Sequence, residues 1–78
     1  MTKIDKMKEY FTSKKNELCS AMYYCRITWI RKKIESVDIC FMRHMCMDND
    51  NLYIAKGFEP IPWKKIKKLE ISVSEFKD

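Results

Sequence analysis

Apolar residues recur at the spacing of an α-helix in the first segment of the chain, where they are Ile4, Met7, Phe11 and Leu18. Lys, Glu and Asn occupy most of the positions between them. Residues 3–20 are therefore predicted to form an amphipathic helix. Thr2 and Asp5 have the spacing of a capping box at a helix start. Such a helix can bind a partner or a membrane surface, but the interpretation we favour is that it covers one face of its own sheet.

The period of the pattern changes to two after this helix. One face of the next segment collects Tyr23, Cys25, Ile27 and Trp29. Aromatic and β-branched residues dominate the segment, so residues 22–32 are predicted to form a half-buried strand. The alternative is that the first helix continues to Ile34. We prefer the strand because good helix formers are almost absent from this stretch.

Two apolar runs, at residues 37–47 and 51–58, flank the turn-forming sequence Asp-Asn-Asp-Asn. This is the signature of a β-hairpin, and the rest of the chain is expected to pack around it. Both faces of the first run are apolar, which predicts a strand that is central in a sheet or buried in an interface. Gly57 is the single glycine, and it is expected to mark a bulge or the turn that leaves the second strand.

Two prolines, Pro60 and Pro62, are expected to end that second strand. Pro62 can begin a single helical turn in which Trp63 and Ile66 face inward. Alternation of apolar and polar residues then predicts a last strand over residues 68–74.

This part of the chain resembles one known pattern. Strand residues 52–54 and 69–71 surround Ile61-Pro62-Trp63 and Ile66, which is similar to the strand–Ile-Pro-Trp–strand segment of bacterial pleckstrin-homology-like domains. The resemblance implies a β-meander here, and we do not take it as family membership.

Together these elements predict a single α+β domain over residues 1–78, with the N-terminal amphipathic helix packed on a three- to four-stranded antiparallel β-meander. A chain of this size hides only about 60% of the surface that it exposes when unfolded, so its core contributes little net stability. One helix cannot cover a sheet that is apolar on both faces. We therefore expect the chain to form a homo-oligomer.

The formal net charge of +5 arises from 13 Lys and 3 Arg against 11 acidic residues. A positive protein favours acidic partners, which include acidic proteins, nucleic acid and anionic membrane surfaces. The charged N-terminal segment does not resemble a signal peptide, and no apolar run reaches the roughly 18 residues of a membrane span. We therefore expect a cytoplasmic protein with no membrane span, in which the four cysteines are reduced.

Candidate chemistry centres on Cys25, Cys40, His44 and Cys46, which could bind zinc, with Cys19 as a further ligand. The spacing within Cys19/Cys25 and within Cys40/Cys46 is wider than in common zinc knuckles, so we expect no metal and no cofactor. His44 and Cys46 could also form a nucleophilic pair, but their apolar neighbours do not favour a thiolate. The single glycine excludes phosphate loops and dinucleotide fingerprints. We therefore expect no enzyme.

The candidate binding surface consists of Trp63, Lys64, Lys65, Lys67 and Lys68, with Tyr53 and Met42. A second basic run, Arg26, Arg31, Lys32 and Lys33, surrounds Trp29. The sequence favours a small non-enzymatic binding protein of the inhibitor or adaptor type, which would occupy an acidic protein surface. Proteins that phages or viruses direct against their hosts offer an analogy.

The alternative is a basic nucleic-acid-binding domain that contacts the phosphate backbone. Trp63 also has an alternative role, as a core residue that anchors the turn after Pro62.

Overall fold

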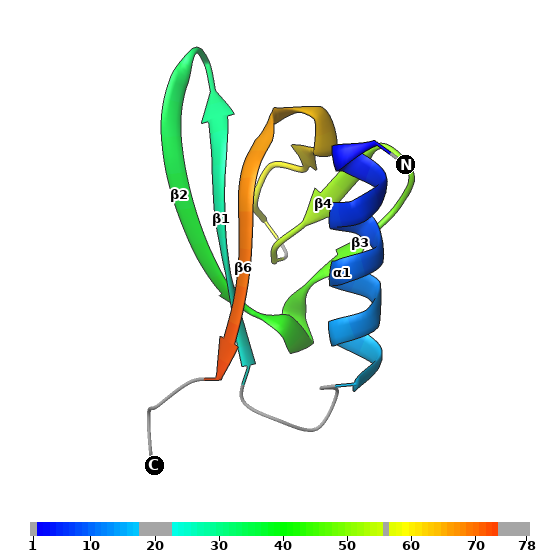
Figure 1. Cartoon of the computed structure of the whole chain (residues 1–78). Helices are drawn as coiled ribbons and strands as arrows, with labels where there is room; N and C mark the ends of the chain where they lie inside the picture. Colours follow the sequence, from blue (N-terminus) through cyan, green and yellow to red (C-terminus); the bar gives the residue numbers. More distant parts are fainter. Residues whose placement is uncertain (1, 18–22, 56, 74–78) are drawn as a thin grey trace.

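The computed structural model describes residues 2–17, 23–55 and 57–73. One α-helix is followed by strands and two short 3₁₀ helices (Figure 1). In chain order the elements are α1 (Lys3–Glu17), β1 (Tyr23–Arg31), β2 (Ile34–Phe41), η1 (Met42–His44), β3 (Cys46–Met47), β4 (Asn51–Tyr53), β5 (Ile61–Pro62), η2 (Trp63–Lys65) and β6 (Ile66–Val73). This is the predicted α+β class.

The start of α1 is fixed by the capping box that the sequence predicts. The backbone N–H of Asp5 donates to Thr2 Oγ1 at 3.1 Å, and the backbone N–H of Thr2 donates to Asp5 Oδ2 at 3.3 Å. These bonds satisfy amide groups that have no partner inside the helix. Phe11 is buried, and Ile4 and Met7 pack against the same core. The predicted helical residues 18–20 lie outside the described ranges.

Strand β1 forms the centre of a three-stranded antiparallel sheet, the long sheet, in the order β2-β1-β6. Arg31 pairs with Ile34 at the end of the β1–β2 hairpin, so Lys32 and Lys33 form its turn. Their φ angles are 49° and 68°, in the left-handed region. Two-residue hairpin turns require this conformation because it matches the twist of the flanking strands.

The prediction of one continuous strand over residues 37–47 is wrong. Strand β2 begins earlier, pairs with β1 and ends at Phe41. The chain then turns through η1 because Met42 and Met45 are three residues apart, and a 3₁₀ turn places both in the core. Strand β2 is also an edge strand and not a central one.

The predicted hairpin around Asp48 exists in a shorter form. Cys46 pairs with Tyr53 and Met47 with Leu52, so β3 and β4 form the hairpin and β2 has no part in it. Strand β4 ends at Tyr53 rather than continuing to Phe58. Gly57 has a φ of 95° and lies in a turn on the way out of the strand. With β5, these strands form a second antiparallel sheet, the short sheet, in the order β3-β4-β5.

The core lies between the inner face of the long sheet, the short sheet and α1. Cys25, Ile27 and Trp29 supply the inner face of β1, as their alternation predicts. Helix α1 contributes Phe11, whose ring meets that of Trp63 edge to face at 6.3 Å and 70°. Helix α1 and β2 lie on opposite sides of the molecule (Figure 1). Among the described residues, no helix covers the outer face of the long sheet.

Candidate functional site

The β1–β2 hairpin carries basic residues at its tip. Arg31, Lys32 and Lys33 are all exposed, and the tip stands clear of the other elements (Figure 1). A left-handed conformation costs a residue with a Cβ roughly 1–2 kcal/mol, which glycine or asparagine would reduce. Two lysines at these positions are not the best choice for folding. Sequence choices that work against stability are concentrated at functional sites.

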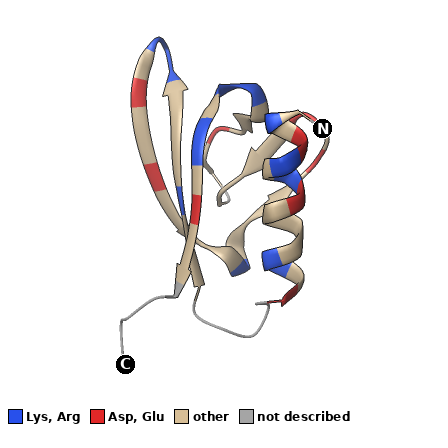
Figure 2. Ribbon diagram, viewed as in Figure 1, with Lys and Arg blue, Asp and Glu red and all other residues tan. Residues whose placement is uncertain are grey.

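A second basic group lies beside this tip. Lys64 and Lys65 belong to η2, and Lys67 and Lys68 to the first half of β6. Pairing of β6 with β1 places Ile66 opposite Trp29, close to the hairpin end. Three residues of the second basic run, Arg31, Lys32 and Lys33, therefore lie at the same end of the molecule as the lysines of the first, while Arg26 lies further along β1, opposite Glu70 (Figure 2). We call this group the basic end; it comprises Arg31, Lys32, Lys33, Lys64, Lys65, Lys67 and Lys68.

Three of these cations are ion-paired. Lys67 Nζ lies 2.9 Å from Glu35 Oε1, Arg31 Nη2 lies 3.5 Å from Glu59 Oε2, and Lys68 Nζ lies 3.6 Å from Glu70 Oε1. Lys32, Lys33, Lys64 and Lys65 have no ion pair with any residue of the described ranges. No described acidic residue offsets the charge of these four side chains. The three ion pairs of the basic end are exposed, so they are expected to add little to stability.

Two large apolar side chains adjoin the basic end. Ile34 is 68% exposed and stands opposite Arg31 across the hairpin. Phe58 is 63% exposed and precedes Glu59, the ion-pair partner of Arg31. Aromatic side chains such as Phe58 are enriched in protein interfaces, whereas lysines are depleted there. The two apolar side chains, and not the lysines, are therefore the part of this surface that resembles an interface.

Two residues of the predicted binding surface are not on the surface. Trp63 is 2% exposed and Met42 is 3% exposed. The indole N–H of Trp63 donates to the carbonyl oxygen of Asp48 at 3.0 Å, and its backbone N–H donates to that of Asp50 at 3.2 Å. Trp63 thus has its alternative role, the anchor of the turn after Pro62, and it holds the two lysines that follow it. The prediction that Trp63 and Met42 offer contact area to a partner does not fit their burial.

Tyr53 lies on β4 of the short sheet. Its hydroxyl donates to Asp48 Oδ2 at 2.6 Å, and Asp48 Oδ1 accepts the backbone N–H groups of Asp50 and Asn51. The hydrogen bond from Tyr53, followed by those from the two amides, lowers the pKa of Asp48. The same bond raises the pKa of Tyr53. These contacts stabilise the β3–β4 turn.

Of the candidate zinc ligands, Cys25 and Cys40 stand opposite each other on β1 and β2, but no third described ligand joins them. Cys25 is buried, whereas His44 and Cys46 are exposed. The S–H group of Cys40 donates a hydrogen bond to the carbonyl oxygen of Ile54 at 2.9 Å. Burial, and next the nearby Cys40, raises the pKa of Cys25 to about 12, so this thiol stays protonated. Within residues 2–17, 23–55 and 57–73, no group of three or more His, Cys, Asp or Glu could hold a metal ion. Cys19 lies outside these ranges.

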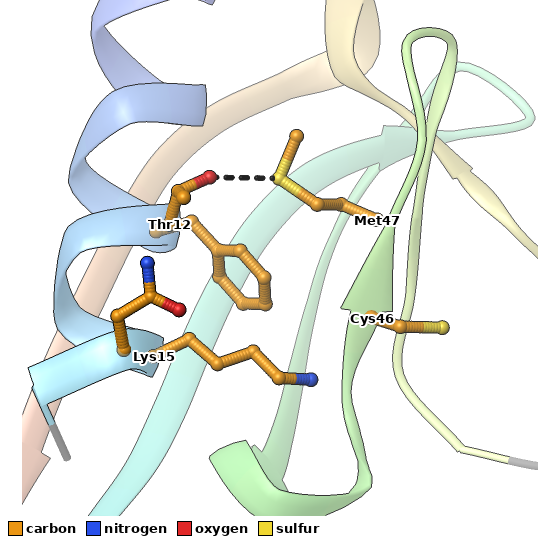
Figure 3. Close-up of a pocket in the computed structure, with 6 residues that line it drawn as sticks. Thr12, Lys15, Cys46 and Met47 are labelled. Carbon is orange, nitrogen blue, oxygen red and sulfur yellow. Dashed lines mark hydrogen bonds between the residues drawn. The ribbon is translucent and has the colours of Figure 1, made fainter. Parts of the chain in front are cut away.

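A shallow pocket of about 250 Å³ separates α1 from β3. Phe11, Thr12 and Lys15 line it from the helix, and Cys46 and Met47 from the strand (Figure 3). Thr12 Oγ1 already donates to Met47 Sδ at 3.3 Å, and Lys15 Nζ lies 5.9 Å from the centre of the Phe11 ring. Thr12 thus links the helix to the strand, whereas Lys15 contacts an aromatic ring of its own helix.

Sequence reasoning found the lysines of η2 and β6, and it noted Lys32 and Lys33 as part of a separate basic run. It left out Ile34 and Phe58. The signal that could have singled out the tip is the missing turn former between β1 and β2. A Lys-Lys turn is an unusual choice where Asn-Gly is favoured. It therefore draws attention to the tip.

None of the described helices is long and apolar enough to cross a membrane. Comparison of the chain with protein-family models, with curated proteins and with solved structures found no match.

Proposed function

We propose that this chain is a small non-enzymatic binding protein of the inhibitor or adaptor type. It binds an acidic surface of another protein through its basic end. The observation that carries the proposal is the meeting of residues from two distant basic runs beside exposed Ile34 and Phe58. Four lysines that form no ion pair with a described residue create a positive field that attracts an acidic partner and raises the association rate. The two apolar side chains then provide contact area from which water is excluded.

The anchoring of Trp63 also supports this function. Because Trp63 is buried and hydrogen-bonded to Asp48 and Asp50, the η2 turn is fixed before a partner arrives. Lysines on a fixed turn lose less conformational freedom on binding than lysines on a loose loop. The proposal includes a cytoplasmic location, where exposed thiols such as Cys46 stay reduced.

The experiment is capture of partners from a cell lysate of the native host by three immobilised forms of the protein. The first is the wild type, the second is Lys64→Glu with Lys65→Glu, and the third is Lys14→Glu with Lys15→Glu. The last pair has the same change in net charge but lies near the far end of α1. Each form must first melt cooperatively. We expect one acidic protein, resistant to nuclease, to be held by the wild type and the α1 variant and lost from the η2 variant.

A second function, binding to the phosphate backbone of nucleic acid, is favoured by one feature. The basic tip is carried by a two-stranded ribbon, and the major groove of B-form DNA admits such a ribbon. Binding of this kind to a defined DNA duplex should weaken as salt rises, with a logarithmic slope of about −0.9 for each phosphate contacted. Capture that disappears after nuclease treatment would favour this function over the first.

A further inference from the structure

The outer face of the long sheet becomes apolar toward the free edge of β2. Residues of β6 on this face are polar, namely Lys68, Glu70 and Ser72, which pair with alternate residues of β1. On β2 the corresponding positions include Val37 and Ile39, which are 46% and 63% exposed, and the half-buried Phe41. The inner face of β2 holds Asp38, which accepts the indole N–H of Trp29 at 2.7 Å. Strand β2 thus exposes its apolar side and turns a polar side inward.

The same residues present free backbone groups. In a hairpin with a two-residue turn, the pair next to the turn is hydrogen-bonded and the pairs then alternate. Arg31 and Ile34 are that first pair. The N–H and C=O groups of Val37 and Ile39 and the N–H group of Phe41 therefore point away from β1, toward the open edge. The carbonyl oxygen of Phe41 accepts the S–H of Cys40 at 3.5 Å. An exposed row of this kind is a template for pairing with another strand.

The two edges of the long sheet differ in how well they are protected against pairing with a strand of another chain. Strand β6 carries Lys67 and Lys68, and lysine is a residue that keeps edge strands from pairing. Strand β2, with the sequence Ile-Glu-Ser-Val-Asp-Ile-Cys-Phe, contains no Lys, Arg or Pro. Of the two edges of the long sheet, the β2 edge is therefore the one that lacks these protective residues within the described part of the chain.

We infer that β2 pairs antiparallel with β2 of a second copy of this chain, and that the two long sheets join into one. The register that fits places Ile39 opposite its own counterpart and Val37 opposite Phe41. Residues whose backbone groups point to the open edge then face one another across the two copies. Three apolar pairs form on the outer face. Asp38 stands opposite Cys40, and Glu35 lies level with Arg43. No two like charges stand directly opposite each other in this register.

Net charge opposes association of two copies, but it favours this orientation over one that brings the two basic ends together. Each chain carries a formal net charge of +5, and two basic ends placed together would repel. An antiparallel pair of β2 strands directs the two hairpin tips to opposite ends of the dimer. The basic ends stay far apart and remain free, so the dimer goes beyond the proposed function and is compatible with it.

The test is sedimentation equilibrium of the full chain at micromolar to submillimolar concentration. For the wild type we expect the mass to rise toward twice the 9.5 kDa of one chain. Ile39→Lys should keep the mass of one chain. Phe58→Lys is the matched control, because Phe58 has the same exposed fraction of 63% but lies off the β2 edge, and it should dimerise like the wild type.

Two further variants test the mode of pairing. Ile39→Pro removes an N–H that points to the open edge and leaves the β1–β2 hydrogen bonds intact, so it should fold and remain a single chain. Ile39→Glu should also be a single chain alone. Mixed with Ile39→Lys, it should form dimers again, because the two residues face each other across the symmetry axis.

A wild type that keeps the mass of one chain at every concentration overturns the inference. Dimerisation of a folded Ile39→Pro variant overturns it as well, since backbone pairing at β2 would then be dispensable.

Discussion

Trp63 shows how one residue can serve a surface without being part of it. Its ring packs against Phe11, and its indole N–H and backbone N–H bind carbonyl oxygens of the β3–β4 turn. The side chain therefore joins α1, the short sheet and η2. Sequence pattern alone left two roles open for this residue, because a tryptophan beside lysines is equally typical of an interface anchor and of a core residue.

Replacement of Trp63 by Ala should lower the free energy of unfolding by about 3–5 kcal/mol, because a large buried side chain leaves a cavity. Urea unfolding followed by circular dichroism measures this. Lys64→Ala is the neighbouring control and should change stability by less than about 0.5 kcal/mol, since Lys64 is exposed. A Trp63→Ala protein as stable as the wild type would show that the ring is not part of the core.

Asp48 is expected to make stability depend on pH in the acid range. Its pKa is lowered in the folded protein, chiefly by the hydrogen bond from Tyr53, so its contribution is complete above the unfolded pKa of about 3.9. As pH falls, the unfolded chain takes up the proton first, and this contribution is lost as pH passes through the folded pKa. Asp48→Asn should therefore flatten the acid limb of a plot of unfolding free energy against pH.

The control for this experiment is Asp50→Asn. Asp50 lies in the same turn, but its carboxylate accepts no hydrogen bond from the residues that the structure describes. The acid limb of Asp50→Asn should follow that of the wild type. An Asp48→Asn variant that loses stability in acid as steeply as the wild type would mean that the turn contacts do not favour the charged carboxylate.

Among the elements, the β1–β2 hairpin combines a strained turn with exposed lysines. Replacing Lys32 by Asn and Lys33 by Gly suits the left-handed turn and should stabilise the protein by about 1–2 kcal/mol. Thermal unfolding measures the gain. If the tip binds the partner, the same variant should also bind more weakly in the capture experiment.

Lys32→Gln with Lys33→Gln separates the two effects, because it removes the charges and keeps the strained turn. It should bind weakly without a gain in stability. Full partner binding by both double variants would remove the tip from the binding surface.

Element by element, local patterns predicted what local interactions decide. The capping box of Thr2 and Asp5, the inner face of β1 and the turn at Pro62 each depend on residues close in sequence. The continuous strand over 37–47 was wrong because its alternation hides a change of sheet. Met42 and Met45 fit a strand and a 3₁₀ turn equally well in the pattern, and only packing against β1 and the short sheet decides between them.

The candidate site was predicted in part for the same reason. The lysines after Trp63 form a visible cluster in sequence, whereas their meeting with Lys32 and Lys33 depends on β6 pairing with β1. Exposure of Ile34 and Phe58 likewise depends on where the sheets end. Contacts between distant segments carry no local signal.

At the scale of the whole molecule, binding of an acidic protein partner should depend on salt mainly through the association rate. The exposed lysines of the basic end attract such a partner at low salt, so the association rate should fall as salt screens the charges, while the dissociation rate changes little. Surface plasmon resonance with the captured partner measures both rates. Phe58→Ala and Ile34→Ala should instead mainly raise the dissociation rate, because they remove contact area.

The position of β6 has a consequence for the order in which the protein can fold. Strands β1 and β2 can pair as soon as both have left the ribosome, since only two residues separate them. The other side of β1 stays open until β6 has been synthesised, because β6 is its second neighbour. During translation the nascent chain thus holds an unfinished sheet whose central strand has a vacant edge. A chaperone that binds nascent chains would bind this one in that interval, before β6 completes the long sheet.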